Sequence, residues 1–158
     1  MPGEDPESAL AAGAGFQVEG LGTLYTRLGE NLTRIEEADE VAAHYRNVLD
    51  QIRERRLDGE ISVKLTQLGF DHDVERTFEH ASALAAQAAR NGKTFWIDME
   101  GSAYVEQTVR LYERLRATHP RTGICLQAYL KRTAADIARV LPLDPAIRLV
   151  KGAYDEPA

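Results

Sequence analysis

Cysteine, long apolar runs and an excess of basic charge are all lacking in this sequence of 158 residues. The single cysteine, Cys125, excludes an intrachain disulfide and a cluster of thiolate metal ligands, and it fits a reducing compartment. The 25 acidic and 19 basic side chains give a net charge of −6, so there is no electrostatic reason to expect nucleic-acid binding. The four histidines have no metal-ligand spacing, and we expect no metal site.

No apolar run approaches the roughly 20 residues that a transmembrane helix requires. The first residues are acidic rather than basic, unlike those of a secretory signal peptide. These features predict a cytoplasmic protein and leave peripheral contact with the inner face of a membrane open. Residues 1–15 are rich in Pro, Gly, Ala and acid, and we expect a flexible lead-in to a domain over residues 16–158.

Strand-like and helix-like segments alternate along that domain. The five expected strands lie at residues 23–28, 61–66, 94–99, 123–127 and 147–151, and four amphipathic helical patterns separate them. Strict alternation predicts an α/β fold with a parallel sheet and right-handed crossovers. An open doubly-wound sheet would be complete at this length, whereas a (β/α)₈ barrel usually needs about 250 residues. The period alone leaves both architectures open.

A lysine, Lys64, stands within the second expected strand, where a parallel sheet is normally apolar. Removing an unpaired ammonium from water is costly, so Lys64 needs a partner or a ligand carboxylate. Asp98 is the expected partner, because it stands at a comparable height on the next expected strand, and if the two strands are neighbours, about 4.8 Å apart, the side chains can meet. The pair would either fix the strand register or belong to a functional site. Polar residues at other strand ends favour a site, since both candidate folds place active sites there.

Gln127, Arg148 and Lys151 are three of these strand-end residues. The face-mates of Gln127 are a glycine and a cysteine, which leave volume for a flat cofactor ring, although a glutamine here could equally cap a loop. Arg148 shares its face with a valine, and the simpler interpretation is a snorkelling surface arginine. Gly152 permits close approach of the backbone to a ligand, with Lys151 available for phosphate; an ordinary exit from the strand would look the same.

Four segments, in this order and with fitting spacing, resemble the proline dehydrogenase family: Ile61–Gly69, Ile97–Glu100, Leu126–Leu130 and Arg148–Tyr154. The segment Leu28-Gly29-Glu30 also resembles the family's first barrel strand. The resemblance runs from about residue 16 to the end of the chain. It implies the N-terminal half of a (β/α)₈ barrel, with about five parallel strands and four helices, that holds FAD above the carboxyl ends of the strands.

The resemblance also implies an activity, the oxidation of L-proline to Δ1-pyrroline-5-carboxylate, which is the first step of proline catabolism to glutamate. Electrons would pass through FAD to a membrane quinone. Lys64 resembles the family's substrate-binding lysine, and Asp98 and Arg148 resemble its catalytic residues. The residues that resemble cofactor contacts are Met99, Gln127, Arg148, Lys151, Gly152 and Ala153.

The resemblance stops before the later barrel strands, which in the family supply an arginine pair for the substrate carboxylate. The chain looks like a truncated part of the enzyme, and we expect it to be inactive alone or to require a complementary half or self-association. An inactive remnant and a flavin-binding α/β module without turnover are the alternatives. An unrelated complete α/β domain, such as a small flavodoxin-like protein, is the third.

Overall fold

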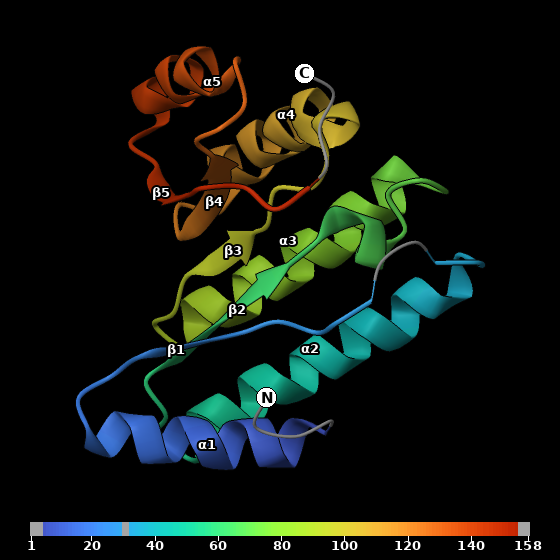
Figure 1. Cartoon of the computed structure of the whole chain (residues 1–158). Helices are drawn as coiled ribbons and strands as arrows, with labels where there is room; N and C mark the ends of the chain where they lie inside the picture. Colours follow the sequence, from blue (N-terminus) through green and yellow to red (C-terminus); the bar gives the residue numbers. More distant parts are fainter. Residues whose placement is uncertain (1–4, 30–31, 155–158) are drawn as a thin grey trace.

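The computed structural model describes residues 5–29 and 32–154, in which five strands form one parallel sheet (Figure 1). These strands are β1 (Thr23–Tyr25), β2 (Gly59–Val63), β3 (Phe95–Ile97), β4 (Thr122–Gln127) and β5 (Ala146–Val150). They lie across the sheet in chain order, each hydrogen-bonded to the next. A doubly-wound sheet reverses its strand order near the middle, whereas a (β/α)₈ barrel keeps it sequential. The chain therefore forms a curled half-barrel, as predicted.

Five helices alternate with the strands (Figure 1). They are α1 (Pro6–Val18), α2 (Glu36–Glu54), α3 (Val74–Arg90), α4 (Ser102–Thr118) and α5 (Thr133–Val140), with short 3₁₀ turns η1 (Leu65–Leu68) and η2 (Leu141–Leu143). The four helices that follow β1 to β4 were expected, and α1 was not. Within the described residues, no helix is both long and apolar enough to cross a membrane.

Helix α1 occupies most of the stretch that we expected to be a flexible lead-in. The side chain of Asp5 caps it by accepting a hydrogen bond from the backbone N–H of Ser8 at 2.9 Å. Pro6 stands at the start of the helix, where its fixed φ favours helix formation instead of breaking it. Leu10 is 2% exposed and belongs to the core. This burial and the cap outweigh the glycines that made the composition look flexible; residues 1–4 lie outside the described part.

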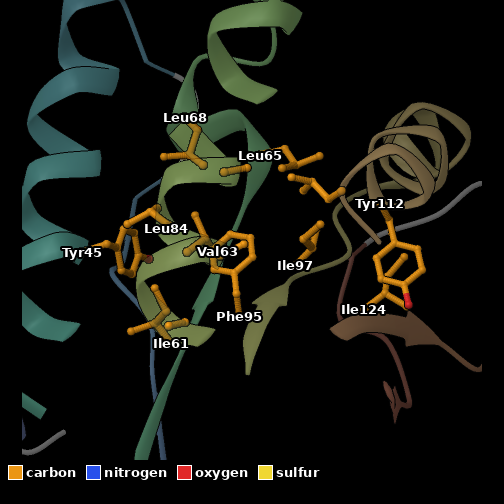
Figure 2. Packing of buried hydrophobic residues seen from close by; sticks show 14 of the residues in the cluster. Tyr45, Ile61, Val63, Leu65, Leu68, Leu84, Phe95, Ile97, Tyr112 and Ile124 are labelled. Carbon is orange, nitrogen blue, oxygen red and sulfur yellow. The ribbon is translucent and has the colours of Figure 1, made fainter. Parts of the chain in front are cut away.

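The core lies between the sheet and its helices (Figure 2). Alternate strand residues supply one side of it: Ile61, Val63, Phe95, Ile97 and Ile124, each fully buried. The helices supply Tyr45, Leu84 and Tyr112, which are also buried. Burying a side chain of this size contributes about 1.5–3 kcal/mol, so this face determines how the strands sit. The intervening strand residues must then point to the opposite, inner face, where the polar side chains lie.

The first strand is shorter than the expected 23–28. After Tyr25, the backbone groups of the chain form hydrogen bonds with side chains instead of with β2. Gln67 Nε2 donates to the carbonyl oxygens of Arg27 at 2.8 Å and Gly29 at 2.5 Å. The hydroxyl of Tyr45 accepts from the backbone N–H of Arg27 at 2.9 Å. These bonds hold residues 27–29 beside the sheet without a β-ladder. Glu30, the end of the segment that resembles the family's first strand, lies outside the described residues.

Candidate active site

One cavity of about 640 Å³ opens at the carboxyl ends of the strands. All eight residues expected at the site line it: Lys64, Asp98, Met99, Gln127, Arg148, Lys151, Gly152 and Ala153. They come from β2, β3, β4 and β5 or from the segments that follow these strands. Cys125, Val150 and Tyr154 complete the lining and were not expected to contact a ligand. The parallel sheet thus brings together four sequence segments that are far apart in the chain.

Asp98 has an ion-pair partner that the sequence did not suggest, and the expected contact between Asp98 and Lys64 stays a prediction. The structure pairs the carboxylate of Asp98 with the guanidinium of Arg148, through Nη2 and Oδ1. The hydroxyl of Ser62 also donates to Asp98 Oδ1, at 2.5 Å. Lys64 remains a lining residue of the same cavity and is half-buried. Lys64 directly follows β2, and its two-residue separation from Ser62 puts both residues on the same face of the extended chain.

Arg148 reaches Asp98 because the strand between them is lined by small residues. Arg148 on β5 is paired in register with Cys125 on β4, and Asp98 follows β3 on the far side of β4. The long guanidinium side chain can therefore reach past the small thiol to the Asp98 carboxylate. Burial raises the pKa of the Cys125 thiol, and the adjacent Arg148 guanidinium opposes this only in part. Cys125 is therefore a neutral thiol at neutral pH.

The side-chain amide of Gln127 has hydrogen-bond partners for its nitrogen but none among the described residues for its oxygen. Its Nε2 donates to the carbonyl oxygens of Met99 at 3.1 Å and Glu100 at 3.3 Å, and the residue is 3% exposed. Its Oε1 is buried and has no hydrogen-bond partner among the described residues. Leaving a buried acceptor unsatisfied costs about 1–3 kcal/mol. A bound group with an N–H donor at this wall of the cavity would remove that cost.

The turn after β5 is fixed by the loop after β4. The backbone N–H of Tyr129 donates to the carbonyl oxygen of Lys151 at 3.1 Å, and the Tyr129 hydroxyl donates to that of Tyr154 at 3.0 Å. Gly152 has φ +114°, and a Cβ added there would lie 2.1 Å from the Tyr129 ring. Only glycine fits this turn, which presents the backbone of residues 151–153 to the cavity.

These features fit a flavin cofactor better than a metal. Arg148 Nε and Gln127 Oε1, a donor and an acceptor, are both buried at the cavity without partners among the described residues. Lys64 and Lys151 add positive charge near the rim, which suits an anionic ligand. No group of three His, Cys, Asp or Glu side chains within residues 5–29 and 32–154 is arranged to hold a metal ion.

Sequence reasoning missed Ser62 and Tyr129 as parts of this site. Ser62 shares the inner face of β2 with Lys64, so the two-residue period of a strand could have indicated it. Tyr129 lies in the segment that resembles the family, but its contact with the turn after β5 depends on how two loops meet. No local pattern reveals such a contact.

Comparison with known proteins gives a consistent result. The sequence model of the family described as proline dehydrogenase matches residues 9–157. Proline dehydrogenase 1 of Bacillus subtilis (strain 168) is 35% identical over 158 residues, which is 100% of this chain and 52% of that protein. Proline dehydrogenase of Deinococcus radiodurans is 30% identical over 165 residues, covering 100% of this chain and 53% of that protein. The chain therefore spans about half the length of the curated relatives that it matches.

Solved structures show the same fold. Proline utilization A from Bdellovibrio bacteriovorus, inactivated by N-propargylglycine, superposes with a TM-score of 0.84 at 19% identity, covering 98% of this chain and 20% of that one. A proline utilization A with proline bound in remote sites gives a TM-score of 0.77 at 25% identity, covering 96% of this chain and 18% of that one. The half-barrel thus matches a segment of much larger chains.

Proposed function

The chain belongs to the proline dehydrogenase family, and from that premise we propose that it forms part of the active site of an FAD-dependent proline dehydrogenase. The reaction would be oxidation of L-proline to Δ1-pyrroline-5-carboxylate. One observation carries the proposal beyond the family: Lys64, Asp98, Arg148 and the glycine turn at 152 line a single cavity. Its location at the carboxyl ends of the strands is where barrel enzymes hold their substrates.

Lys64 would bind the substrate. Its ammonium reaches the cavity from the end of β2 and can form a charge-assisted hydrogen bond with the carboxylate of proline. Asp98, which resembles a catalytic residue of the family, would act through Arg148, because its carboxylate is bound by Arg148 and Ser62. It orients the guanidinium at the cavity wall.

The cofactor would be held by Met99, Gln127, Arg148 and the turn 151–153. The redox chemistry is that of FAD, which when bound takes up hydride from the substrate and passes electrons to a quinone. A positioned guanidinium stabilises an electron-rich ring electrostatically, and the ion pair with Asp98 holds Arg148 at the cavity wall. Gln127 Oε1 offers an acceptor for a ring N–H, and Gly152 allows the backbone to approach closely.

Turnover would require a complementary half of the barrel or a second copy of the chain. Among the described strands, β1 and β5 are the two edges of the sheet, and Leu149 on β5 is 56% exposed. An uncovered strand edge with an apolar side chain favours association. A cytoplasmic location with peripheral contact to a membrane would suit a quinone as the acceptor.

The proposal is tested by flavin and ligand binding to the 158-residue chain. FAD is titrated into the protein, and a ring analogue of L-proline that cannot be oxidised is then added while the flavin absorbance is recorded. We expect Lys64→Met to weaken analogue binding by about tenfold to a hundredfold, the value of one hydrogen bond to a charged group. Lys93→Met is the matched control, because Lys93 pairs with Asp58 at 3.0 Å and does not line this cavity.

Three outcomes separate the possibilities. A chain that binds no FAD, either alone or with a complementary half, contradicts the proposal. A chain that binds FAD but shows no response to the analogue, alone or with a complementary half, is a flavin-binding module without turnover. Equal analogue affinity in the Lys64 variant and the wild type removes Lys64 from the substrate site.

A further inference from the structure

Ser62 occupies a junction between three strands. It is 1% exposed on β2, and its hydroxyl donates to Asp98 Oδ1 at 2.5 Å. The same hydroxyl oxygen accepts from Arg148 Nη2 at 3.2 Å. Nη2 also binds Asp98 Oδ1 directly, so the serine, the carboxylate and the guanidinium close a triangle of contacts. The triangle joins β2 and β5, which are not neighbours in the sheet.

We propose that Ser62 is a positioning residue that sets the orientation of the Arg148 guanidinium at the cavity. Both hydrogen bonds that Arg148 makes to described side chains use the same nitrogen, Nη2, with Asp98 and Ser62 as partners. Nε has no partner among the described residues. A guanidinium held by one nitrogen at one acceptor can still rotate about that contact. The second contact, to Ser62, removes this rotation.

The backbone of Ser62 is itself held from the opposite side of the sheet. The Tyr45 hydroxyl of α2 lies 3.2 Å from the Ser62 carbonyl oxygen and 3.1 Å from Gln67 Oε1, so its one proton is shared between these two acceptors, and Tyr45 is 1% exposed. Asp98 is tied to the same strand, because its N–H donates to the carbonyl oxygen of Val63 at 3.0 Å. The hydroxyl therefore presents its donor and acceptor from a fixed point. A serine can bridge a carboxylate and a guanidinium in this way, because its hydroxyl donates and accepts at once.

The consequence for the site rests on the proposed function. Ser62 does not line the cavity, whereas Arg148 does, so the serine acts on a bound ligand only through the arginine. With the guanidinium fixed, its charge faces one part of a flavin ring. Without the serine hydroxyl, the Arg148 guanidinium adopts several orientations, and a bound flavin ring loses a preorganised charged partner.

The inference is tested by nuclear magnetic resonance on the 158-residue chain without cofactor. The Arg148 Nε–H signal is assigned by its loss in Arg148→Lys. We expect Ser62→Ala to speed the solvent exchange of this proton at least tenfold and to lower its heteronuclear NOE, with backbone amide exchange in the core unchanged. Thr122→Val is the matched control, because it removes a buried strand hydroxyl that has no described partner.

Ser62→Cys leaves no cavity and replaces the hydroxyl by a slightly larger thiol, which is a weak donor, so it serves if the alanine variant does not fold. An unchanged Arg148 signal in a folded Ser62 variant overturns the inference. On the same proteins, FAD affinity is expected to fall about tenfold in Ser62→Ala and to stay constant in Thr122→Val. A wild-type chain that binds no FAD would contradict the proposed function only, since the Arg148 signal still reports on Ser62.

Discussion

Replacing Gly152 by alanine should release the turn that closes the cavity. An alanine at φ +114° carries backbone strain of about 1–3 kcal/mol. The new Cβ would also lie 2.1 Å from the Tyr129 ring, far inside the 3.4 Å at which ordinary contact begins. Either the turn moves, or the ring swings out and gives up its hydrogen bond to the Tyr154 carbonyl, which is worth about 0.5–1.5 kcal/mol. The strain and the lost hydrogen bond together should destabilise the closed turn by about 1.5–4.5 kcal/mol.

Amide hydrogen exchange measures this opening where it occurs. The N–H groups of Ala128 and Tyr129 donate to the carbonyl oxygens of Val150 and Lys151, at 2.7 and 3.1 Å. Their protection should fall at least tenfold in Gly152→Ala, because about 1.4 kcal/mol corresponds to a factor of ten. Global stability in urea should change less, because the turn lies near the end of the described chain and can open locally.

A matched control separates the ring contact from the strain. Gly29 has φ +110°, nearly the value at Gly152, and no described atom lies within 4 Å of a Cβ added there. Gly29→Ala therefore reports backbone strain alone. Tyr129→Ala combined with Gly152→Ala should recover part of the loss, since the ring is removed. The reasoning is refuted if Gly152→Ala leaves the exchange of Tyr129 unchanged, or if removing the ring makes no difference to the alanine variant.

Two further predictions concern stability. The guanidiniums of Arg132 and then Arg139 hold the pKa of Glu106 down at about 2, below its ordinary 4.5, so the stability that this carboxylate contributes is present above pH 4.5 and is lost as the pH falls toward 2. Glu106→Gln should lower the urea midpoint near pH 6 and match the wild type near pH 2; parallel curves at every pH would count against the network between α4 and α5. A Cβ at Gly123 would lie 2.4 Å from the Trp96 ring, and Gly123→Ala should destabilise the fold by about 1–3 kcal/mol in urea unfolding. Unchanged stability would show that the inner face can accommodate an added methyl group beside the Trp96 ring.

The order of the five strands and of the helices between them followed from local pattern in the sequence, whereas site residues such as Met99 and Ala153 were expected only from the family resemblance. A strand's two-residue period assigns its side chains to faces, and parallel strands place their carboxyl ends at one edge. These two rules bring Lys64, Asp98 and Gln127 together without knowledge of the barrel. The position of each strand in the sheet needed the structure, since alternation is the same in a doubly-wound sheet.

Helix α1 shows a different limit. Proline and glycine were interpreted by composition, whereas their effect depends on position: Pro6 begins the helix and Asp5 caps it. The deciding term is the burial of Leu10, which comes from packing against the rest of the fold and cannot be seen in residues 1–15. Propensity is a weak prior that such tertiary contacts override.

The contact between Asp98 and Arg148 was not foreseen for a related reason, since the sequence argument compared neighbouring strands only. Curling of the sheet brings the inner side chains of β5 back toward those of β2, and Arg148 meets Ser62 across two intervening strands. The face that carries Arg148 looked apolar, because only the residues of its own strand were considered. Cys125 was interpreted as leaving volume for a flat ring, yet its first effect is to let Arg148 cross β4. The cavity and the ion pair therefore have one cause, the small side chains on the inner face of β4.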